Sequence, residues 1–242
     1  VPDHRLAGCL LAAILYFPLF HALTSAANPQ LAAATASSPV RVHADPADCS
    51  VQFDPVGKTV FDRSCDVAKS YLARAGVSYA NVEEPAGTLA FVSIGEQRFD
   101  SFRGEDLARA DFAAEKAAWE KALAAVMSEA GYPAKADPAL VNKPLVVVIL
   151  FALVLLVTMV YGPIAAALVE MFPARIRYTS MSLPYHVGNG WFGGFLPTTA
   201  FAMVAATGNI YSGLWYPVVV AAATAVIGWF FVREMKGADI DA

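Results

Sequence analysis

The side chains best placed for chemistry in this sequence lie within an apolar stretch. Between Arg177 and Arg233, His186 is the only titratable residue apart from tyrosines, and Asn189 follows one helical turn later. An ionisable group deep in a membrane-spanning helix faces a cavity or a polar partner rather than lipid. His186 is therefore a candidate for proton coupling or gating, and Asn189 shares its helix face. A neutral histidine that hydrogen-bonds to a neighbouring helix would explain the same pattern.

A short charged elbow precedes this stretch. Glu170 ends a run without charged residues, at the carboxyl end of a predicted helix, where its negative charge opposes the helix dipole. We therefore expect it to pair with Arg175 or Arg177. Such a cluster could latch one conformation of the protein. It could equally be a solvated surface pair that contributes little.

Glycines and prolines interrupt the apolar runs. The segment Gly188-Asn-Gly190-Trp-Phe-Gly193 has the spelling G-x-G-x-x-G, but a dinucleotide site needs a βαβ unit around it, and this segment lies inside an apolar span. The spacing of Gly190 and Gly194 instead favours close packing of helix backbones. Prolines remove a helical hydrogen bond and favour kinks, although they are also common in membrane helices. The expected kink and packing positions are Gly162, Pro163, Pro184, Gly190, Gly194 and Pro197.

Two of the three cysteines, Cys49 and Cys65, lie sixteen positions apart in a polar block. A disulfide closing a loop of that size stabilises by about 3 kcal/mol in the chain-entropy model, in an oxidising compartment. Two unpaired thiols are the alternative interpretation. The third cysteine, Cys9, lies in an apolar run. No second Cys or His pair has ligand spacing, so we predict no metal site, and we interpret His43 as an ordinary surface residue.

Catalysis has no support in the residue pattern. Within the polar block over residues 24–143, no nucleophile with a base, paired carboxylates or metal cluster has the spacing that an active site needs. No basic patch interleaved with aromatic residues indicates nucleic-acid binding. We therefore expect no enzyme and no cofactor.

The elements that must position these residues are mainly membrane helices. The chain has 242 residues, of which 57% are hydrophobic, and a mean hydropathy of +0.49. Runs of about 20 apolar residues can cross a bilayer core as helix. A signal peptide would also fit the first run, but its aromatic residues and proline favour a span. The predicted spans are Leu6–Leu23, Pro144–Val169, Thr179–Ala206 and Gly213–Val232.

Residues 24–143 differ in character from the spans. They hold 12 of the 17 Lys and Arg residues and 16 of the 21 Asp and Glu residues. Alternating apolar positions predict strands near Val40–His43 and Thr88–Ile94, and helical patterns cover Asp66–Ala75 and Glu105–Ala130. We predict an α-helical membrane protein with an α+β insert over 24–143, after a first helix over 1–23 and before three helices and a short tail over 144–242.

The basic residues outside the insert predict its side of the membrane. Arg5, Arg175, Arg177, Arg233 and Lys236 all fall on one side when there are four crossings, and the positive-inside rule makes that side cytoplasmic. The insert would then be extracytoplasmic, where the proposed disulfide is allowed. The termini would be cytoplasmic.

The run YGPIAAALVEMFPARIRYTSMSLPYHVGNGWFGGFLP, followed by IYSGLWYP, resembles the C-terminal part of the major facilitator superfamily, in its metabolite:proton symporter branch. The resemblance is strong over Val141–Arg233 and extends to the first span. It implies that the four spans correspond to the ninth to twelfth helices of a twelve-helix carrier. It also implies that Thr158 and Tyr161 line the central cavity, and that Tyr185, His186 and Asn189 lie on the supporting eleventh helix.

These carriers move small polar or anionic metabolites by alternating access coupled to proton entry. The resemblance therefore implies the C-terminal part of such a symporter, in the lipid bilayer of a bacterial-type plasma (inner) membrane, with Glu170, Arg175 and Arg177 as a cytoplasmic gate. Its partners would be the substrate, protons and the missing N-terminal helices. The substrate and the role of the insert do not follow from it. The alternative is a four-span membrane anchor for an extracytoplasmic binding or interaction domain.

The predicted disulfide can be tested directly. Mass spectrometry of the unreduced protein is expected to find Cys49 linked to Cys65, with Cys9 free to react after denaturation, because both insert cysteines would face an oxidising compartment. Recovery of two alkylated thiols in the insert would contradict the prediction.

Overall fold

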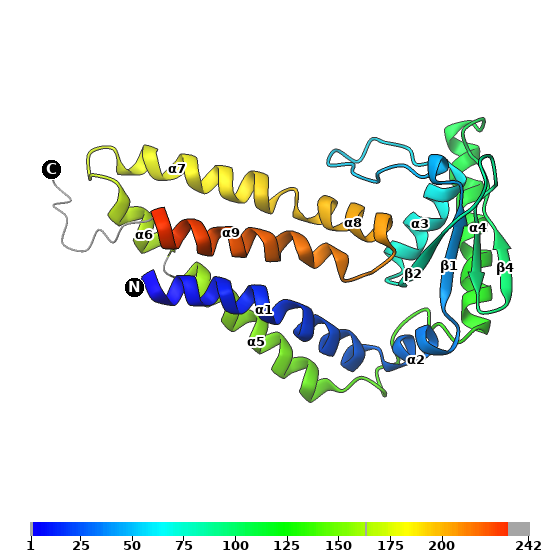
Figure 1. The fold of residues 1–242 in the computed structure, drawn as a ribbon, viewed down its shortest axis with the longest axis horizontal. Helices are drawn as coiled ribbons and strands as arrows, with labels where there is room; N and C mark the ends of the chain where they lie inside the picture. The colour runs from blue at the N-terminus through cyan, green and yellow to red at the C-terminus, as the bar shows by residue number, and fades with distance from the viewer. Residues whose placement is uncertain (1, 163, 232–242) are drawn as a thin grey trace. The chain divides into compact units, whose positions relative to one another are not determined.

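The computed structural model describes residues 2–162 and 164–231, and its contacts form two compact units (Figure 1). The helical unit contains the described parts of Val1–Leu23, Pro144–Pro197 and Leu214–Ala242. The insert unit contains Thr24–Lys143 together with Thr198–Gly213. Residues 198–213, which the sequence assigned to the third span and the turn after it, therefore pack with the insert.

The helical unit consists of apolar helices whose backbone groups bond within each segment, as a water-free environment requires. Within the described residues, three helices are long and apolar enough to cross a membrane. They are Ala7–Ala27, Lys143–Met171 and Ser212–Phe231. In terms of elements, the first is part of α1 (Pro2–Ala27), the second is α5 (Lys143–Tyr161) with α6 (Ile164–Met171), and the third contains α9 (Trp215–Phe231).

The third predicted span is not one continuous helix. It is divided into α7 (Arg177–Val187), a π-helical segment (Gly188–Gly193) and α8 (Leu196–Thr207). Glycines have a low helix propensity, and Pro197 has no backbone N–H to donate to a helical hydrogen bond. The chain therefore adopts wider turns in this region. Because each piece is short, the described structure contains three long apolar helices where the sequence predicted four.

The insert unit is built on a four-stranded mixed sheet in the order β2-β1-β3-β4. β1 (Val40–Ala44) pairs in parallel with β2 (Tyr79–Glu83) and antiparallel with β3 (Phe91–Ile94), which forms a hairpin with β4 (Gln97–Asp100). Gly95 has a φ of 58° in the two-residue hairpin loop, a conformation that glycine adopts without strain. The sequence predicted β1 and β3 but not the two edge strands.

Helices cover one face of this sheet. The short helix α2 (Pro29–Ser37) precedes β1. α3 (Ser64–Arg74) connects the parallel strands β1 and β2, and α4 (Arg109–Glu129) follows β4. Alternate residues of β1 and β3 are buried against the helices, whereas Arg41 and His43 lie on the other face. The core residues include Val42, Val92, Val67, Leu72, Trp119 and Leu123.

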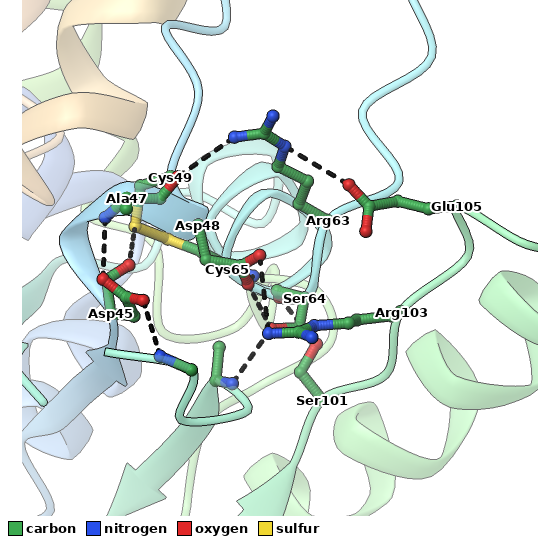
Figure 2. Close-up of polar contacts among 12 residues, drawn as sticks. Asp45, Ala47, Asp48, Cys49, Arg63, Ser64, Cys65, Ser101, Arg103 and Glu105 are labelled. Atoms are coloured by element: carbon green, nitrogen blue, oxygen red, sulfur yellow. Dashed lines mark hydrogen bonds and ion pairs between the residues drawn. A yellow bond between two sulfur atoms is a disulfide. The ribbon is translucent and has the colours of Figure 1, made fainter. Parts of the chain in front are cut away.

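A disulfide corner holds the start of α3 (Figure 2). Cys49 and Cys65 are bonded, with Cα atoms 5.1 Å apart, while Cys9 is a free, buried thiol. The residue before α3, Arg63, makes no side-chain cap. Asp48 supplies one instead: its carboxylate accepts hydrogen bonds from the Ser64 hydroxyl and from the Cys65 amide at 3.3 Å. The carboxylate also favours the positive end of the helix.

The edge strand β2 is covered by the end of α8, within the insert unit. The Tyr79 amide donates to the Gly208 carbonyl at 2.8 Å, and its hydroxyl donates to the Ala205 carbonyl at 2.7 Å. Asn81 donates to the Ala206 carbonyl at 3.1 Å. The last carbonyls of a helix lack partners inside it, so β2 satisfies them. Burial raises the pKa of the Tyr79 hydroxyl, which keeps it protonated as the donor.

Gly190, in the π-helical segment, and Gly194, directly after it, differ in the space around them. A Cβ at Gly194 would lie 2.2 Å from the Gly190 carbonyl oxygen, whereas a Cβ at Gly190 would meet nothing within 4 Å. The close contact is thus within one helix, and in the described part of the chain Gly190 faces no partner helix. From the sequence, we expected both Gly190 and Gly194 to allow close packing against a neighbouring helix.

This asymmetry generates a matched pair of substitutions. We expect Gly194→Ala to lower the free energy of unfolding by about 1–3 kcal/mol, because the backbone must shift to admit the methyl group. Gly190→Ala is expected to be neutral or stabilising by up to about 1 kcal/mol. Thermal unfolding of the purified chain in detergent measures both. Equal destabilisation would instead support packing between two helices.

Candidate functional site

A polar contact between two helix interruptions is the centre of the candidate site. The Tyr161 hydroxyl, at the last residue of α5, donates to Asn189 Oδ1 at 2.8 Å. The Asn189 amide nitrogen donates to the Tyr185 carbonyl at 3.0 Å. Because the nitrogen must face a carbonyl, the oxygen faces the tyrosine, and the amide orientation is fixed. We call the Tyr161–Asn189 hydrogen bond the clasp.

The clasp lines an open hollow of about 710 Å³, which we call the clasp hollow. Its walls come from α5, α6, α7, the π-helical segment and α9, and they are mostly apolar. Tyr161, Tyr185 and Asn189 contribute polar groups, together with Thr224 of α9. A largely apolar hollow with a few convergent polar groups is typical of a small-molecule site.

His186 lies in a second hollow of about 560 Å³ at the α6–α7 junction, the histidine hollow. Tyr185 lines both hollows, and its ring meets that of His186 edge-on, with centroids 5.9 Å apart. Arg177 and Ser182 also line the histidine hollow. The structure therefore groups Tyr161, Tyr185 and Asn189 in the clasp hollow and places His186 beside them rather than among them.

A third hollow, of about 300 Å³, lies beside α1, and we call it the α1 hollow. Cys9 and Tyr16 of α1 line it with Tyr161, Tyr216 and Thr224. α1 approaches α5 closely here, because a Cβ at Gly8 would lie 3.1 Å from side-chain atoms of Met159 and Val160. Tyr161 thus lines both the clasp hollow and the α1 hollow.

Sequence reasoning placed Thr158 in the cavity and did not consider Thr224 or Tyr216. The Thr158 hydroxyl donates to the Leu155 carbonyl at 2.9 Å, within its own helix. The Tyr216 hydroxyl donates to the Phe192 carbonyl of the π-helical segment at 2.9 Å. Thr224 and Tyr216 are polar residues inside an apolar span, and that pattern could have identified them from the sequence. The resemblance pointed to residues of other helices instead.

The charged elbow is arranged differently from the expected latch. Arg177 donates from Nε to the Phe172 carbonyl at 3.0 Å, and one of its terminal nitrogens is buried without a partner among the described residues. Glu170 is exposed, and no ion pair joins it to Arg175 or Arg177 in the part of the chain that the structure describes. The guanidinium of Arg177 thus stabilises the chain reversal after α6.

The boundary between α5 and α6 lies at the position where the sequence predicts a kink, near Gly162. α5 ends at Tyr161 and α6 begins at Ile164, with the Gly162 amide still bonded to the Thr158 carbonyl at 2.9 Å. Pro163 lies outside the described residues. The clasp hydroxyl is therefore carried by the last helical residue before this interruption.

A serine, a histidine and a glutamate meet on the exposed sheet face of the insert unit, which sequence reasoning missed. His43 Nδ1 lies 2.9 Å from Glu84 Oε1 and its Nε2 lies 3.2 Å from Ser93 Oγ, with the ring stacked on Phe91. The interpretation of His43 as an ordinary surface residue is therefore wrong. The members lie 41 and 50 positions from His43, so only strand pairing brings them together.

The strand pairing around this Ser–His–Glu arrangement occupies the backbone groups near Ser93. Ser93 is inside β3, a central strand paired on both sides, so the neighbouring backbone groups take part in the sheet ladder. An acyl-transfer site needs free backbone or side-chain donors for the oxyanion. The network instead stabilises the exposed sheet face, with Arg98 stacked on Phe91 at 3.7 Å from the ring centroid.

Comparison with known proteins assigns a family to the segment whose residues line the clasp hollow and the histidine hollow. Residues 120–242, which include α5 to α9, match the family described as "Sugar (and other) transporter". No curated protein and no solved structure matched the chain in the other two comparisons. The matched family together with the long apolar helices indicates a helical membrane protein with a small-molecule substrate. The chain belongs to the sugar (and other) transporter family of the major facilitator superfamily.

Proposed function

We propose that this chain is the C-terminal part of a proton-coupled secondary transporter that moves small polar or anionic metabolites by alternating access. The clasp carries the proposal. A tyrosine at the end of α5 and an asparagine in the π-helical segment meet across the clasp hollow. A neutral hydrogen bond in such a place can open for a polar solute without leaving a buried charge.

The interruptions at Gly162 and over 188–195 suit a moving helix pair. Secondary transporters place their binding sites where membrane helices are interrupted, because freed backbone and polar side chains face the cavity there. Each partner of the clasp lies at one interruption. Bending at either interruption would lengthen the Tyr161–Asn189 distance, so the clasp would be made in one conformation and broken in another.

His186 is the proposed coupling residue. Its ring contacts Tyr185, which lines the clasp hollow, and it shares the histidine hollow with Arg177. The contact with Tyr185 would link a change at His186 to the clasp hollow. We propose that Glu170, Arg175 and Arg177 act as a gate in a conformation in which the glutamate pairs with an arginine.

The proposed topology has four crossings, corresponding to helices nine to twelve of the carrier. α7, the π-helical segment and α8 together form the third crossing, over the predicted range of 28 residues from Thr179 to Ala206. The arginines of the elbow and tail then face the cytoplasm of a bacterial-type inner membrane. The insert, with its disulfide, faces outward, where disulfides persist.

The second candidate is a membrane-anchored binding or interaction domain. The observation that favours it is the insert unit, with its own core and a covered sheet edge. The polar residues that line the hollows of the helical unit favour the transporter, because a simple anchor has no use for them.

Transport by the full-length carrier tests the clasp. We expect Tyr161→Phe and His186→Ala to lower proton-driven uptake about five- to a hundredfold at unchanged membrane abundance, because a lost hydrogen bond in a partly dry cavity is worth about 1–3 kcal/mol. Tyr71→Phe, which removes a hydroxyl within the insert, is the matched control and should leave uptake unchanged.

A double-mutant cycle separates the clasp from independent roles of its two residues. Tyr161→Phe and Asn189→Ala together should lower uptake little more than either alone, because both remove the same bond. Multiplied losses would contradict the clasp. Uptake into liposomes by the 242-residue chain alone would contradict the proposal that further helices complete the path.

Labelling of intact cells tests the topology. In a Cys9→Ala background, Ser128→Cys on the exposed face of α4 should react with an impermeant maleimide, whereas Ala174→Cys in the elbow should not, because the elbow would face the cytoplasm. Reaction at the elbow alone would invert the topology, and reaction at both sites after permeabilisation verifies that each thiol is accessible.

A further inference from the structure

The insert unit contains a hollow that transport does not explain. It has a volume of about 460 Å³ and lies between α3, the first turns of α4, and the loop that follows the disulfide corner. Phe61 and Phe112 form part of its wall, with Phe201 of α8. Its polar residues are Gln52, Asp54, Thr59, Ser70, Arg74, Arg109 and Lys116. We call it the insert hollow.

Positive charge predominates in this hollow. Arg74 is paired with Glu120 at 2.7 Å, but Arg109 has no partner among the described residues. Lys116 is half-buried over the Phe112 ring, 5.6 Å from its centroid. Burial lowers the pKa of the Lys116 ammonium, the nearby Arg74 lowers it further, and Glu120 opposes both. A bound anion would offset this unfavourable burial of charge.

The one carboxylate in the wall is already satisfied by its own loop. Asp54 accepts hydrogen bonds from the backbone amides of residues 56, 57 and 59, at 2.7 to 3.2 Å. Burial acts to raise the pKa of Asp54, and these amides outweigh it and lower the pKa. The carboxylate thus shapes the loop, while Arg109 and Lys116 are left to attract a ligand.

A buried side-chain amide in this hollow has an oxygen that lacks a hydrogen-bond donor among the described residues. Gln52 is only 3% exposed, and its Nε2 donates to the Asp66 carbonyl at 3.0 Å. That bond fixes the amide orientation, because a carbonyl can only accept. Oε1 is then buried without a hydrogen-bond partner among the described residues. Such an acceptor needs an explanation, and a ligand hydroxyl that reached it would supply one.

We propose that the insert hollow binds a small hydroxylated carboxylate, with the carboxylate held by Lys116 and Arg109 and a hydroxyl donated to Gln52 Oε1. The carbon chain would lie against the Phe112 ring. Two residues about two turns apart on α4 supply the charge, and a residue from another segment supplies the acceptor, so the site selects for both groups on one molecule. The proposal does not depend on transport by the helical unit.

Three ligands of matched size test the two requirements on the purified full chain in detergent. Glycerate has both groups, propionate lacks the hydroxyls, and glycerol lacks the charge. We expect isothermal titration to give a dissociation constant for glycerate at least about tenfold lower than for either of the others. Equal affinity for all three, or no binding of glycerate, would overturn the proposal.

Two lysines of the same helix provide a matched pair of variants. Lys116→Met should weaken glycerate binding at least about tenfold, whereas Lys121→Met, at an exposed position of α4 outside the hollow, should leave it unchanged. Equal losses in both variants would indicate non-specific charge attraction and overturn the site.

Two further variants test the acceptor and the location. Gln52→Met should reduce glycerate affinity to that of propionate while leaving propionate affinity unchanged, and near-ultraviolet circular dichroism verifies that the insert is folded. Should Gln52→Met unfold the insert, the Lys116 and Lys121 pair still decides the proposal. Glycerate binding that persists in Lys116→Met and is lost in Tyr161→Phe would place the ligand in the clasp hollow, and so contradict this site while supporting the proposed function.

Discussion

The structure depends first on the need to satisfy backbone hydrogen bonds without water. In the apolar segments the only available partners are other backbone groups, so the chain forms helices wherever proline and glycine permit. Where they do not, wider turns replace regular ones, and the Gly194 amide bonds to the Asn189 carbonyl five residues back at 3.0 Å. These interruptions expose polar groups, and the Tyr161–Asn189 bond lies across them. The constraint that shapes the helices therefore also positions the candidate site.

The insert unit also satisfies its backbone hydrogen bonds, but it does so with a sheet and a strand-to-helix contact. Its sheet buries one face under α3 and α4, and its parallel edge strand β2 bonds to the last carbonyls of α8. This contact stabilises both elements. An exposed strand edge can pair with another chain and aggregate, and the last carbonyls of a helix lack partners within the helix. Gly208 permits this contact, with a φ of 76° and no room for a Cβ beside the Tyr79 carbonyl.

The two units place polar groups according to the cost of burying them. Around the clasp hollow the hydrogen-bonding side chains are neutral, since an uncompensated charge in an apolar setting is far more costly than a paired amide or hydroxyl. Three cations line the insert hollow, which opens to solvent, and within the described part of the chain only Arg74 is paired with a carboxylate. Neutral hydrogen-bonding groups suit an apolar setting, and charged groups suit a hollow that opens to solvent.

Local signals in the sequence determined the apolar helices, the α4 helix and the two inner strands, because length, periodicity and alternation act over a few residues. They also indicated Asn189 as a candidate site residue, and the resemblance added Tyr161. Tertiary structure alone decided the edge strands β2 and β4, whose polar residues carry no alternation, and the meeting of His43 with Glu84 and Ser93. It also decided the interrupted third span and the burial of Gln52 Oε1 without a partner among the described residues. These features depend on partners that are distant in sequence, or on how the backbone relaxes around glycine. A short stretch of residues does not determine either of them.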